Sequence, residues 1–288
     1  MRKQFNLSLP GGKLLELGRR TAVVGVLNVT PDSFSDGGRS LDRARAIDRA
    51  IEMEAEGADV IEIGGESTRP GSESVSVEAE LTRLMPVLQG LSGRLRVPIS
   101  IDTRKSEVAR AALDLGAALI NDVSALRFDP DLAGVVSGAG AGLVLMHMRG
   151  APATMQRTPP SEDVFPEIIS DLRTAIAAAA TGGIPSESLI VDPGLGFGKS
   201  LEQNLEILNH LNRLESLGLP IMAGPSRKSF IGKLTGRGVT ERVFGTAASV
   251  AAAIIRGAHL VRVHDVKEMV DVARVTDAVA DAATQNRT

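Results

Sequence analysis

The chain has 288 residues, 43% hydrophobic and 23% charged, with a net charge of −3. This length allows one large domain with a substantial core, and the charge provides no overall basic field for nucleic acid or an anionic membrane. The absence of cysteine excludes disulfides, thiol chemistry and cysteine-ligated metal sites, while the absence of tryptophan and tyrosine leaves few rings for stacking single-stranded nucleic acid.

No segment of the sequence is typical of a membrane span or an export signal. No apolar run reaches the roughly 18 residues that a spanning helix requires. The N-terminus is basic, but Pro10, Gly11 and Gly12 prevent a continuous apolar run after it, so we expect no signal peptide. With no disulfides to form, we expect a cytoplasmic protein that binds neither nucleic acid nor membrane.

The first segments predict a small hairpin in front of the main fold. Residues 4–9 and 13–17 alternate around the Pro-Gly-Gly turn at residues 10–12. Residues 22–28 follow as an apolar, β-rich run, which predicts a strand buried on both faces. This strand ends at Asn28 and opens into a long polar loop, in which Pro31 cannot donate to a strand ladder.

The rest of the chain repeats this plan of a buried strand, a short polar group and a returning helix. We expect further strands at residues 59–63, 98–101, 119–120, 142–146, 189–191, 220–223 and 259–265. We expect helices at residues 41–56, 77–89, 105–115, 131–137, 163–180, 202–214, 242–256 and 266–283. Alternating strands and helices predict a parallel sheet, and eight such units favour a closed (β/α)8 TIM barrel over an open sheet.

The predicted domain organisation follows from this pattern. We expect one domain over residues 1–288, with the hairpin in 1–20, the barrel in 21–283 and a flexible tail in 284–288. In such barrels the site lies at the carboxyl ends of the strands. A simple alternative is that strand ends are polar because they leave the core. Against it, several residues stand directly after or inside strongly apolar runs: Asp102, Asn121, Asp192, Lys228, Arg262 and His264.

Four of these residues form an alternating set of hydrogen-bond acceptors and donors, which suits a flat heterocycle carrying amino and carbonyl groups. They are Asp102, Asn121, Asp192 and Lys228. A buried donor left unpaired costs about 1–3 kcal/mol, so several pairs discriminate strongly between ligands. Taken alone, each acid is explained equally well as a helix N-cap.

A second group suits an anion. Arg262 and His264 lie two residues apart on the last strand and therefore on one face, and Arg69 supplies another cation. Asn28 ends the neighbouring strand across the barrel closure. This group fits a phosphate or pyrophosphate, with Mg²⁺ on an oxygen ligand such as Asn28. The alternative for His264 is a structural histidine; His147 stays open between the two interpretations.

Two other features are interpreted as structural. We interpret His210 and His259 as surface or packing residues. The run from Gly198 to Ser200 resembles the end of a phosphate-binding P-loop, but Pro193 occupies the position of its first glycine. We expect the glycines near Lys199 to let the loop lie close to a flat ligand or a neighbouring loop.

Eight runs of residues, taken in this order, resemble the dihydropteroate synthase family. They are NVTPDSFSDGG from residue 28, GGESTRPG from 64, IDT from 101, NDVS from 121, LMHM from 145, DPGLGFGK from 192, SRKS from 226 and RVHD from 262. The resemblance covers nearly the whole chain. It departs at Pro225, where a small residue is commoner, and in the variable N-terminal hairpin.

The resemblance implies a transferase of folate synthesis. Such an enzyme joins 6-hydroxymethyl-7,8-dihydropterin pyrophosphate to p-aminobenzoate and releases 7,8-dihydropteroate and pyrophosphate. Pyrophosphate would leave before the amine attacks a pterin-stabilised cation. The resemblance also implies Mg²⁺ as the cofactor, competition by sulfonamides, and a homodimer.

The same resemblance implies roles for individual residues. The pterin would be held by Asp102, Asn121, Val123, Met146, Asp192, Phe197, Gly224 and Lys228. The pyrophosphate would be held by Asn28, Thr68, Arg262 and His264, with Asn28 also serving the metal. Two loops that close over the site would help build the p-aminobenzoate pocket from Phe34, Arg69, Pro70 and Ser229. The catalytic residues would be Asp36, Lys228, Arg262 and His264.

Two other functions fit part of the pattern. A folate-binding methyltransferase barrel would share the pterin pocket but require a corrinoid partner, and the intact TPDSFSDGG and SRKS runs argue against it. A non-catalytic pterin-binding paralogue should have lost loop residues or leaving-group cations. Asp36, Arg69, Arg262 and His264 all remain here.

Overall fold

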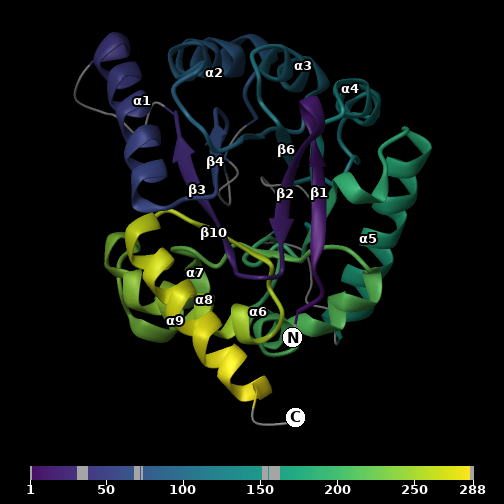
Figure 1. Ribbon diagram of the computed structural model, residues 1–288, viewed down its shortest axis with the longest axis vertical. Helices are drawn as coiled ribbons and strands as arrows, with labels where there is room; N and C mark the ends of the chain where they lie inside the picture. The colour runs from purple at the N-terminus through teal and green to yellow at the C-terminus, as the bar shows by residue number, and fades with distance from the viewer. Residues whose placement is uncertain are drawn as a thin grey trace.

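The protein is a barrel of parallel strands surrounded by helices (Figure 1). The computed structural model describes residues 2–30, 38–67, 72, 74–150, 155 and 163–285. Within these residues the sheet has eight strands in the order β8-β7-β6-β5-β4-β3-β10-β9. A parallel bridge between Val191 and Ile221 joins the two ends of this order. The expected (β/α)8 barrel is therefore confirmed.

The barrel strands are short and buried because helices cover their outer faces and side chains fill the interior. They are β3 (Ala22–Asn28), β4 (Val60–Gly64), β5 (Ile99–Asp102), β6 (Leu119–Asp122), β7 (Gly142–Met146), β8 (Leu189–Asp192), β9 (Met222–Ala223) and β10 (Leu260–Val263). The register pairs Asn28 with Gly64, Gly64 with Asp102, and Asp102 with Asn121. Residues that end successive strands therefore stand side by side at one end of the barrel.

Most helices lie close to their expected positions. They are α1 (Gly38–Glu56), α2 (Val77–Leu91), α3 (Ser106–Asp114), α4 (Leu132–Ala139), α5 (Val164–Thr181), α6 (Leu201–Asn209), α7 (Ser229–Thr235), α8 (Val243–Ile255) and α9 (Val266–Gln285). Among the described residues, none of these helices is both long and apolar enough to cross a membrane.

Two expectations for these helices were wrong. The helix expected over residues 202–214 ends at Asn209, because the backbone of His210 leaves the helical region at φ −123° and ψ 28°. The chain continues as a 3-10 helix from Leu211 to Leu217. The short helix α7 was not expected, since its seven residues offer only two turns of pattern.

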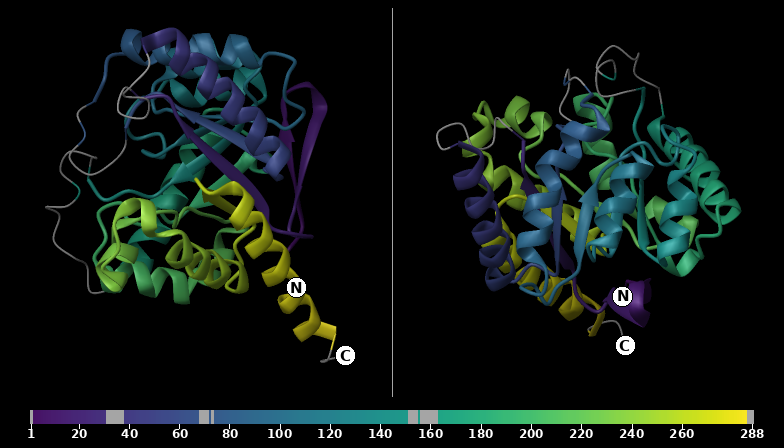
Figure 2. Two further views of the ribbon diagram at one scale, coloured as in Figure 1. Left: turned by 90° about the vertical axis from the view of Figure 1, so that its left-hand side faces the viewer. Right: turned by 90° about the horizontal axis from the view of Figure 1, so that it is seen from above.

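The expected N-terminal hairpin is present. It pairs β1 (Phe5–Leu9) with β2 (Lys13–Leu17) in antiparallel register. Figure 2 shows the hairpin lying across the end of the barrel at which the strands begin. Leu7, Leu9 and Leu17 are 1–5% exposed and pack against the inward-facing residues at the beginnings of the strands. The hairpin therefore closes the amino end of the barrel.

His259 ties the hairpin side to the barrel. Its Nδ1 accepts a hydrogen bond from the backbone N–H of Ile221 at 3.1 Å, and its Nε2 lies 3.0 Å from the carbonyl oxygen of Lys3. The ring also packs edge-on against Phe5. Burial lowers the pKa of His259 to about 4, so the ring is neutral at pH 7. Its interpretation as a packing residue is confirmed.

Candidate active site

Two adjoining cavities open at the carboxyl ends of the strands. The larger has a volume of about 330 Å³, and its lining includes Asn28, Ser229 and His264. The smaller has a volume of about 10 Å³ and is lined by pocket residues that include Asn121, Val123, Met146 and Asp192. Both cavities share four lining residues, Phe197, Gly224, Lys228 and Arg262. The residues expected to bind a heterocycle and those expected to bind an anion thus meet at one place.

Arg262 is the centre of an ion-pair network in the barrel. Its Nε donates to Oε1 of Glu62 at 2.5 Å, and its Nη2 donates to Oδ2 of Asp102 at 2.9 Å. Burial acts to lower the pKa of Arg262, but the charges of Glu62 and Asp102 outweigh it and raise this pKa. Burial also raises the pKa of Asp102 to about 7, although the Arg262 charge opposes the change. The guanidinium therefore stays charged and fixed at the cavity wall.

Glu62 is a functional candidate that the sequence analysis missed. It lies in the middle of β4, is 1% exposed, and contacts both Arg262 and Asn121. The signal was present, because a single acid inside an otherwise apolar strand of a parallel barrel is unusual. It was passed over because it precedes the strand end, where polar residues were expected.

Asp192 ends β8 and contributes a second buried carboxylate. Its Oδ1 accepts a hydrogen bond from the backbone N–H of Gly194 at 2.7 Å. Burial raises the pKa of Asp192 to about 6, and the Gly194 N–H and the charge of Lys228 limit the rise. At neutral pH the ionised group is poised to accept hydrogen bonds from ligand N–H groups.

Lys228 lines the narrow cavity together with Asp192. Its Nζ is 3.9 Å from the ring centroid of Phe197, a cation–π distance. Burial, together with the charge of the neighbouring Arg262, lowers the pKa of Lys228 to about 7, against the opposing charges of Asp192 and Asp102. The small cavity has room for about one water molecule. A flat ligand can therefore enter between Lys228 and Phe197 only when these two side chains move apart.

His264 faces the larger cavity as a neutral ring. Its Nδ1 lies 2.9 Å from Oγ of Ser226, which also accepts the backbone N–H of His264 at 3.1 Å. Burial and the charges of Arg262 and Arg227 lower the pKa of His264 to about 3. The serine hydroxyl can donate to Nδ1, which leaves Nε2 to carry the proton and donate to an anion. His264 is therefore neutral in the structure, whereas the sequence analysis grouped it with the cations.

Asn28 stands at the cavity beside a glycine. A Cβ added to Gly64 would lie 3.5 Å from Oδ1 of Asn28 and 3.5 Å from Cβ of Asp102. The missing side chain therefore keeps open the space between Asn28 and Asp102. An amide oxygen facing such a space is a ligand that Mg²⁺ accepts.

The loop after β8 is held by Lys199. Its Nζ donates to the carbonyl oxygens of Gly194 at 2.9 Å, Phe197 at 3.1 Å and His147 at 3.3 Å. Gly194 has φ +67°, and a Cβ there would lie 1.9 Å from the His147 oxygen. Burial lowers the pKa of Lys199 to about 7. Lys199 thus shapes the wall that presents Phe197, which agrees with rejecting a P-loop here.

His147 is a buried neutral histidine behind this loop. Burial and the charges of Lys199, Arg127 and Arg149 lower its pKa to about 2. Within the described residues neither ring nitrogen reaches hydrogen-bond geometry, although Nε2 lies 3.4 Å from Oδ2 of Asp171, and neither cavity includes His147 in its lining. The structure therefore favours a structural role for it over a ligand-binding one.

The loop after β9 is held by two arginines. Arg227 has the left-handed backbone angle φ +57°, donates through Nε to Asp265 at 3.1 Å, and donates its backbone N–H to Thr246 at 3.1 Å. Arg242 donates to the carbonyl oxygens of Arg227 at 2.9 Å and Lys228 at 3.3 Å. These contacts maintain a strained backbone that aims Lys228 at the cavity.

The structure places some predicted site residues and leaves others outside its described part. Ser229 begins α7, is exposed, and lines the larger cavity. Val123, Met146 and Phe197 form a small apolar cluster at the narrow cavity. Five predicted residues lie outside the described residues: Phe34, Asp36, Thr68, Arg69 and Pro70.

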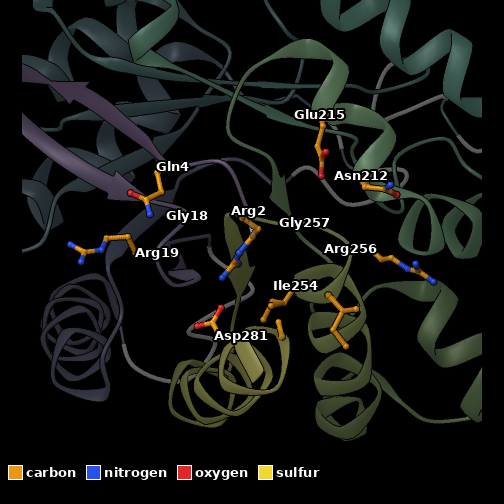
Figure 3. Close-up of a pocket in the computed structure, with 12 residues that line it drawn as sticks. Arg2, Gln4, Gly18, Arg19, Asn212, Glu215, Ile254, Arg256, Gly257 and Asp281 are labelled. Carbon is orange, nitrogen blue, oxygen red and sulfur yellow. The ribbon is translucent and has the colours of Figure 1, made fainter. Parts of the chain in front are cut away.

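A further cavity, of about 580 Å³, opens near the amino end of the barrel, between the hairpin side and α8 and α9 (Figure 3). Arg19 and Arg256 extend away from each other there. Arg2 is already engaged, since it donates to Thr21 and to the carbonyl oxygen of Ala258, both at 2.6 Å. The polar side chains of this cavity do not converge on one point as those at the carboxyl ends of the strands do.

Comparison with known proteins shows the family of this chain. The family described as pterin binding enzymes matches residues 24–264. A dihydropteroate synthase of Synechocystis is 46% identical over 96% of this chain and 96% of its own length. Among solved structures, dihydropteroate synthase of Clostridium difficile, in the presence of pteroic acid, is 44% identical with a TM-score of 0.87, covering 91% of this chain and 98% of that one. The enzyme of Xanthomonas albilineans with 4-aminobenzoic acid is 46% identical with a TM-score of 0.88, covering 95% and 98%.

Proposed function

The chain belongs to the dihydropteroate synthase family of pterin-binding enzymes, and we infer that it condenses 6-hydroxymethyl-7,8-dihydropterin pyrophosphate with p-aminobenzoate. The products are 7,8-dihydropteroate and pyrophosphate, and the protein is a transferase of folate biosynthesis. One observation supports this reaction most directly. Arg262 lines both cavities, so the groups that would bind the heterocycle and those that would bind the anion are close enough to contact one substrate molecule.

We propose that the narrow cavity receives the pterin ring. Asn121 and Asp192 offer buried oxygen acceptors in it and Lys228 offers a donor, while Asp102 offers a further buried acceptor from the adjoining larger cavity. The ring would lie against Phe197 and the apolar cluster of Val123 and Met146, with Gly224 leaving room at the wall. Buried acceptors that lose their partners are costly, so a ligand without matching N–H groups is rejected.

We propose that the pyrophosphate lies in the larger cavity against Arg262 and His264. Asn28 fits as the protein ligand of Mg²⁺, because its amide oxygen faces open space and this cation prefers a few protein oxygens together with phosphate oxygens and waters. When bound, Mg²⁺ would neutralise charge on the leaving pyrophosphate. Arg262 supplies a fixed positive charge, and the Nε2–H of His264 supplies a donor.

We propose that pyrophosphate leaves first. The carbon–oxygen bond breaks with its electron pair going to pyrophosphate, and the pterin holds the resulting cation. The amine of p-aminobenzoate then forms the new carbon–nitrogen bond and loses a proton. Arg262, held by Glu62 and Asp102, stabilises the charge that develops on the leaving group more than it stabilises the bound substrate. Ser229 lies at the cavity rim for p-aminobenzoate. The roles of Phe34, Asp36, Thr68, Arg69 and Pro70 rest on the sequence resemblance.

We propose that the protein forms a homodimer in the cytoplasm; the location rests on composition alone. An apolar groove of about 560 Å³ runs over α6, α7 and α8. Phe244 is 85% exposed and Ile255 is 59% exposed on α8, which is unusual for large apolar residues of a monomer. The remainder of α8 packs on the barrel, with Val250 and Ile254 buried. The α8 helix thus has both a core face and an exposed apolar face.

Sedimentation tests the homodimer. The wild-type protein is expected at twice the chain mass of 30.2 kDa, and Phe244→Lys at the chain mass. Leu14→Lys, which changes another exposed apolar residue on the hairpin, serves as the control and should leave the dimer intact. A wild-type protein at the mass of one chain would refute the homodimer.

A turnover assay tests the reaction. The protein is mixed with dihydropterin pyrophosphate and labelled p-aminobenzoate, with and without Mg²⁺, and both products are measured. Equal, Mg²⁺-dependent release of dihydropteroate and pyrophosphate is expected. Pterin binding without condensation would instead favour a non-catalytic paralogue, and methyl transfer to a corrinoid would favour a methyltransferase.

A further inference from the structure

Glu62 lies where two functional groups of the site meet. It faces the barrel interior from β4, and only 1% of it is exposed. Its Oε1 accepts from Nε of Arg262 at 2.5 Å, and its Oε2 accepts from Nδ2 of Asn121 at 3.0 Å. One carboxylate therefore contacts a residue of the heterocycle cavity and the guanidinium shared by both cavities.

This contact fixes the orientation of the Asn121 amide. A carboxylate paired with a guanidinium offers only acceptors, so Asn121 must turn its NH₂ group toward Glu62. Its Oδ1 is buried, and among the described residues this oxygen has no hydrogen-bond partner. Because Asn121 lines the narrow cavity, Oδ1 is an acceptor that a ligand N–H can satisfy. Without Glu62, the amide could present either end to the ligand at similar cost.

The same carboxylate fixes Arg262. Nε and Nη2 of Arg262 are occupied by Glu62 and Asp102. Within the described residues Nη1 makes no hydrogen bond, so it remains available to the leaving group. The guanidinium plane is thereby set by two carboxylates before substrate arrives, which reduces the reorganisation needed during the reaction.

We propose that Glu62 is a positioning residue that orients both ends of one substrate: it turns the Asn121 oxygen toward the pterin and holds Arg262 toward the pyrophosphate. Glu62 touches neither part of the substrate itself. This inference rests on the proposed function, because it takes the heterocycle to be a pterin and the anion to be pyrophosphate. The competing explanation is that Glu62 only balances the buried charge of Arg262.

The variant Glu62→Gln separates these explanations. The new amide has nearly the same shape, but it can donate to Asn121 Oδ1 and so allow the Asn121 amide to turn its NH₂ group to the ligand. Binding of 6-hydroxymethylpterin is read by calorimetry, and binding of its pyrophosphate ester is read in parallel. We expect both to weaken by about tenfold or more, since charged hydrogen bonds have effects of this size.

A second substitution provides a rescue. In the double variant E62Q/N121D the new amide can donate to the new carboxylate and still accept from Arg262, and only acceptors face the ligand. We expect the double variant to bind 6-hydroxymethylpterin more tightly than either single variant. A role in charge balance alone predicts instead that the double variant regains the melting temperature lost in E62Q, because it restores one carboxylate, while E62Q binds 6-hydroxymethylpterin like the wild type.

Glu80→Gln is the matched control. Glu80 is also fully buried and pairs with a cation, Lys105, at 2.5 Å, but it lines neither cavity of the site. We expect E80Q to lower the melting temperature and to change ligand affinity by less than about twofold, because it contacts no ligand-binding group.

The binding results for E62Q and for the double variant each either support or overturn the proposal. If folded E62Q binds 6-hydroxymethylpterin like the wild type, the proposal is overturned. If E62Q does not fold, the double variant decides, because it keeps the charge of the cluster: binding within about tenfold of wild type supports the proposal, and loss of binding by the folded protein overturns it. Failure of the wild type to bind would reject the proposed function instead.

Discussion

The two ends of the barrel are filled by different kinds of side chain. At the amino end, Leu7 and Leu17 of the hairpin pack on apolar strand residues and are each 1% exposed. At the carboxyl end, the carboxyl groups of Glu62 and Asp102 are buried beside the guanidinium of Arg262, which is 15% exposed, and contacts among the three compensate the cost of burial only in part. The amino end is closed by groups that favour burial, whereas the carboxyl end opens into the two cavities of the site.

The amino end therefore stabilises the fold, whereas burying the carboxylates at the carboxyl end costs free energy. Burying a leucine stabilises the fold by about 1.5–3 kcal/mol. Taking a carboxylate out of water costs free energy that an ion pair only partly returns. The raised pKa values of Asp102, about 7, and Asp192, about 6, are the signature of that cost. The amino end therefore supports a carboxyl end that is arranged for ligands.

The largest effect should follow from removing the guanidinium at the carboxyl end. We expect Arg262→Met to destabilise the fold by about 3–5 kcal/mol, since Glu62 and Asp102 are left buried without a cation. We also expect turnover to fall by at least about 10²-fold. Denaturant unfolding and the turnover assay measure the two effects.

The control is the same change at the other end of the barrel. Arg20 is 67% exposed and pairs with Asp59, so Arg20→Met should cost at most about 1 kcal/mol and leave turnover unchanged. Equal effects of the two arginine variants on turnover would contradict the contrast between the ends.

The next effect concerns the amino end alone. Leu7→Ala should cost about 2–5 kcal/mol of folding free energy, because it leaves a cavity between the hairpin and the barrel. The affinity of the remaining folded protein for 6-hydroxymethylpterin should not change. Unfolding curves and calorimetry below the transition test this, and a matching loss of affinity would show that the ends are coupled.

A smaller effect is expected for Asp192→Asn. A charged hydrogen-bond acceptor contributes about 1.5–3 kcal/mol, so pterin affinity should fall about 10- to 100-fold. Folding stability at pH 8 should not fall, because the variant removes a carboxylate whose ionisation burial opposes. Asp59→Asn at the amino end is the control for binding. Unchanged calorimetric affinity for D192N would refute the assigned role.

The smallest effect is the pH dependence of that same variant. The folded pKa of Asp192, about 6, lies above the usual value near 3.9. Between these values the folded state binds a proton that the unfolded state has lost, so this group lowers wild-type stability as pH rises. The stability of D192N relative to wild type should therefore increase from pH 4 to about 6 and then level off. A flat difference across this range would contradict the raised pKa.

Most of the barrel was predictable because each strand is a continuous apolar run. The limits of β3 and β7 agree with the sequence interpretation at both ends. The end of α6 was not predictable, since Leu211 and Leu214 continue the helical spacing although the backbone breaks at His210. Spacing reports which residues are buried, and a 3-10 helix can bury the same ones.

The site was predictable where it coincides with strand ends. Parallel strands bring Asp102, Asn121 and Asp192 to one edge whatever their spacing in sequence. Glu62 was missed because it precedes its strand end; a lone acid in an apolar strand was a local signal, but only the fold shows its partners across the barrel interior. The neutral state of His264 was missed for a similar reason, because burial by distant segments sets its pKa.

The pairing of Glu62 with Arg262 also restricts how this sequence can diverge. A descendant that loses Arg262 retains an unpaired acid in its core, and one that loses Glu62 retains a cation with less compensation. Each single step lowers stability before it offers any new activity. A barrel of this lineage that abandons the reaction should therefore have exchanged both positions together, so that the two residues vary as a pair among its descendants.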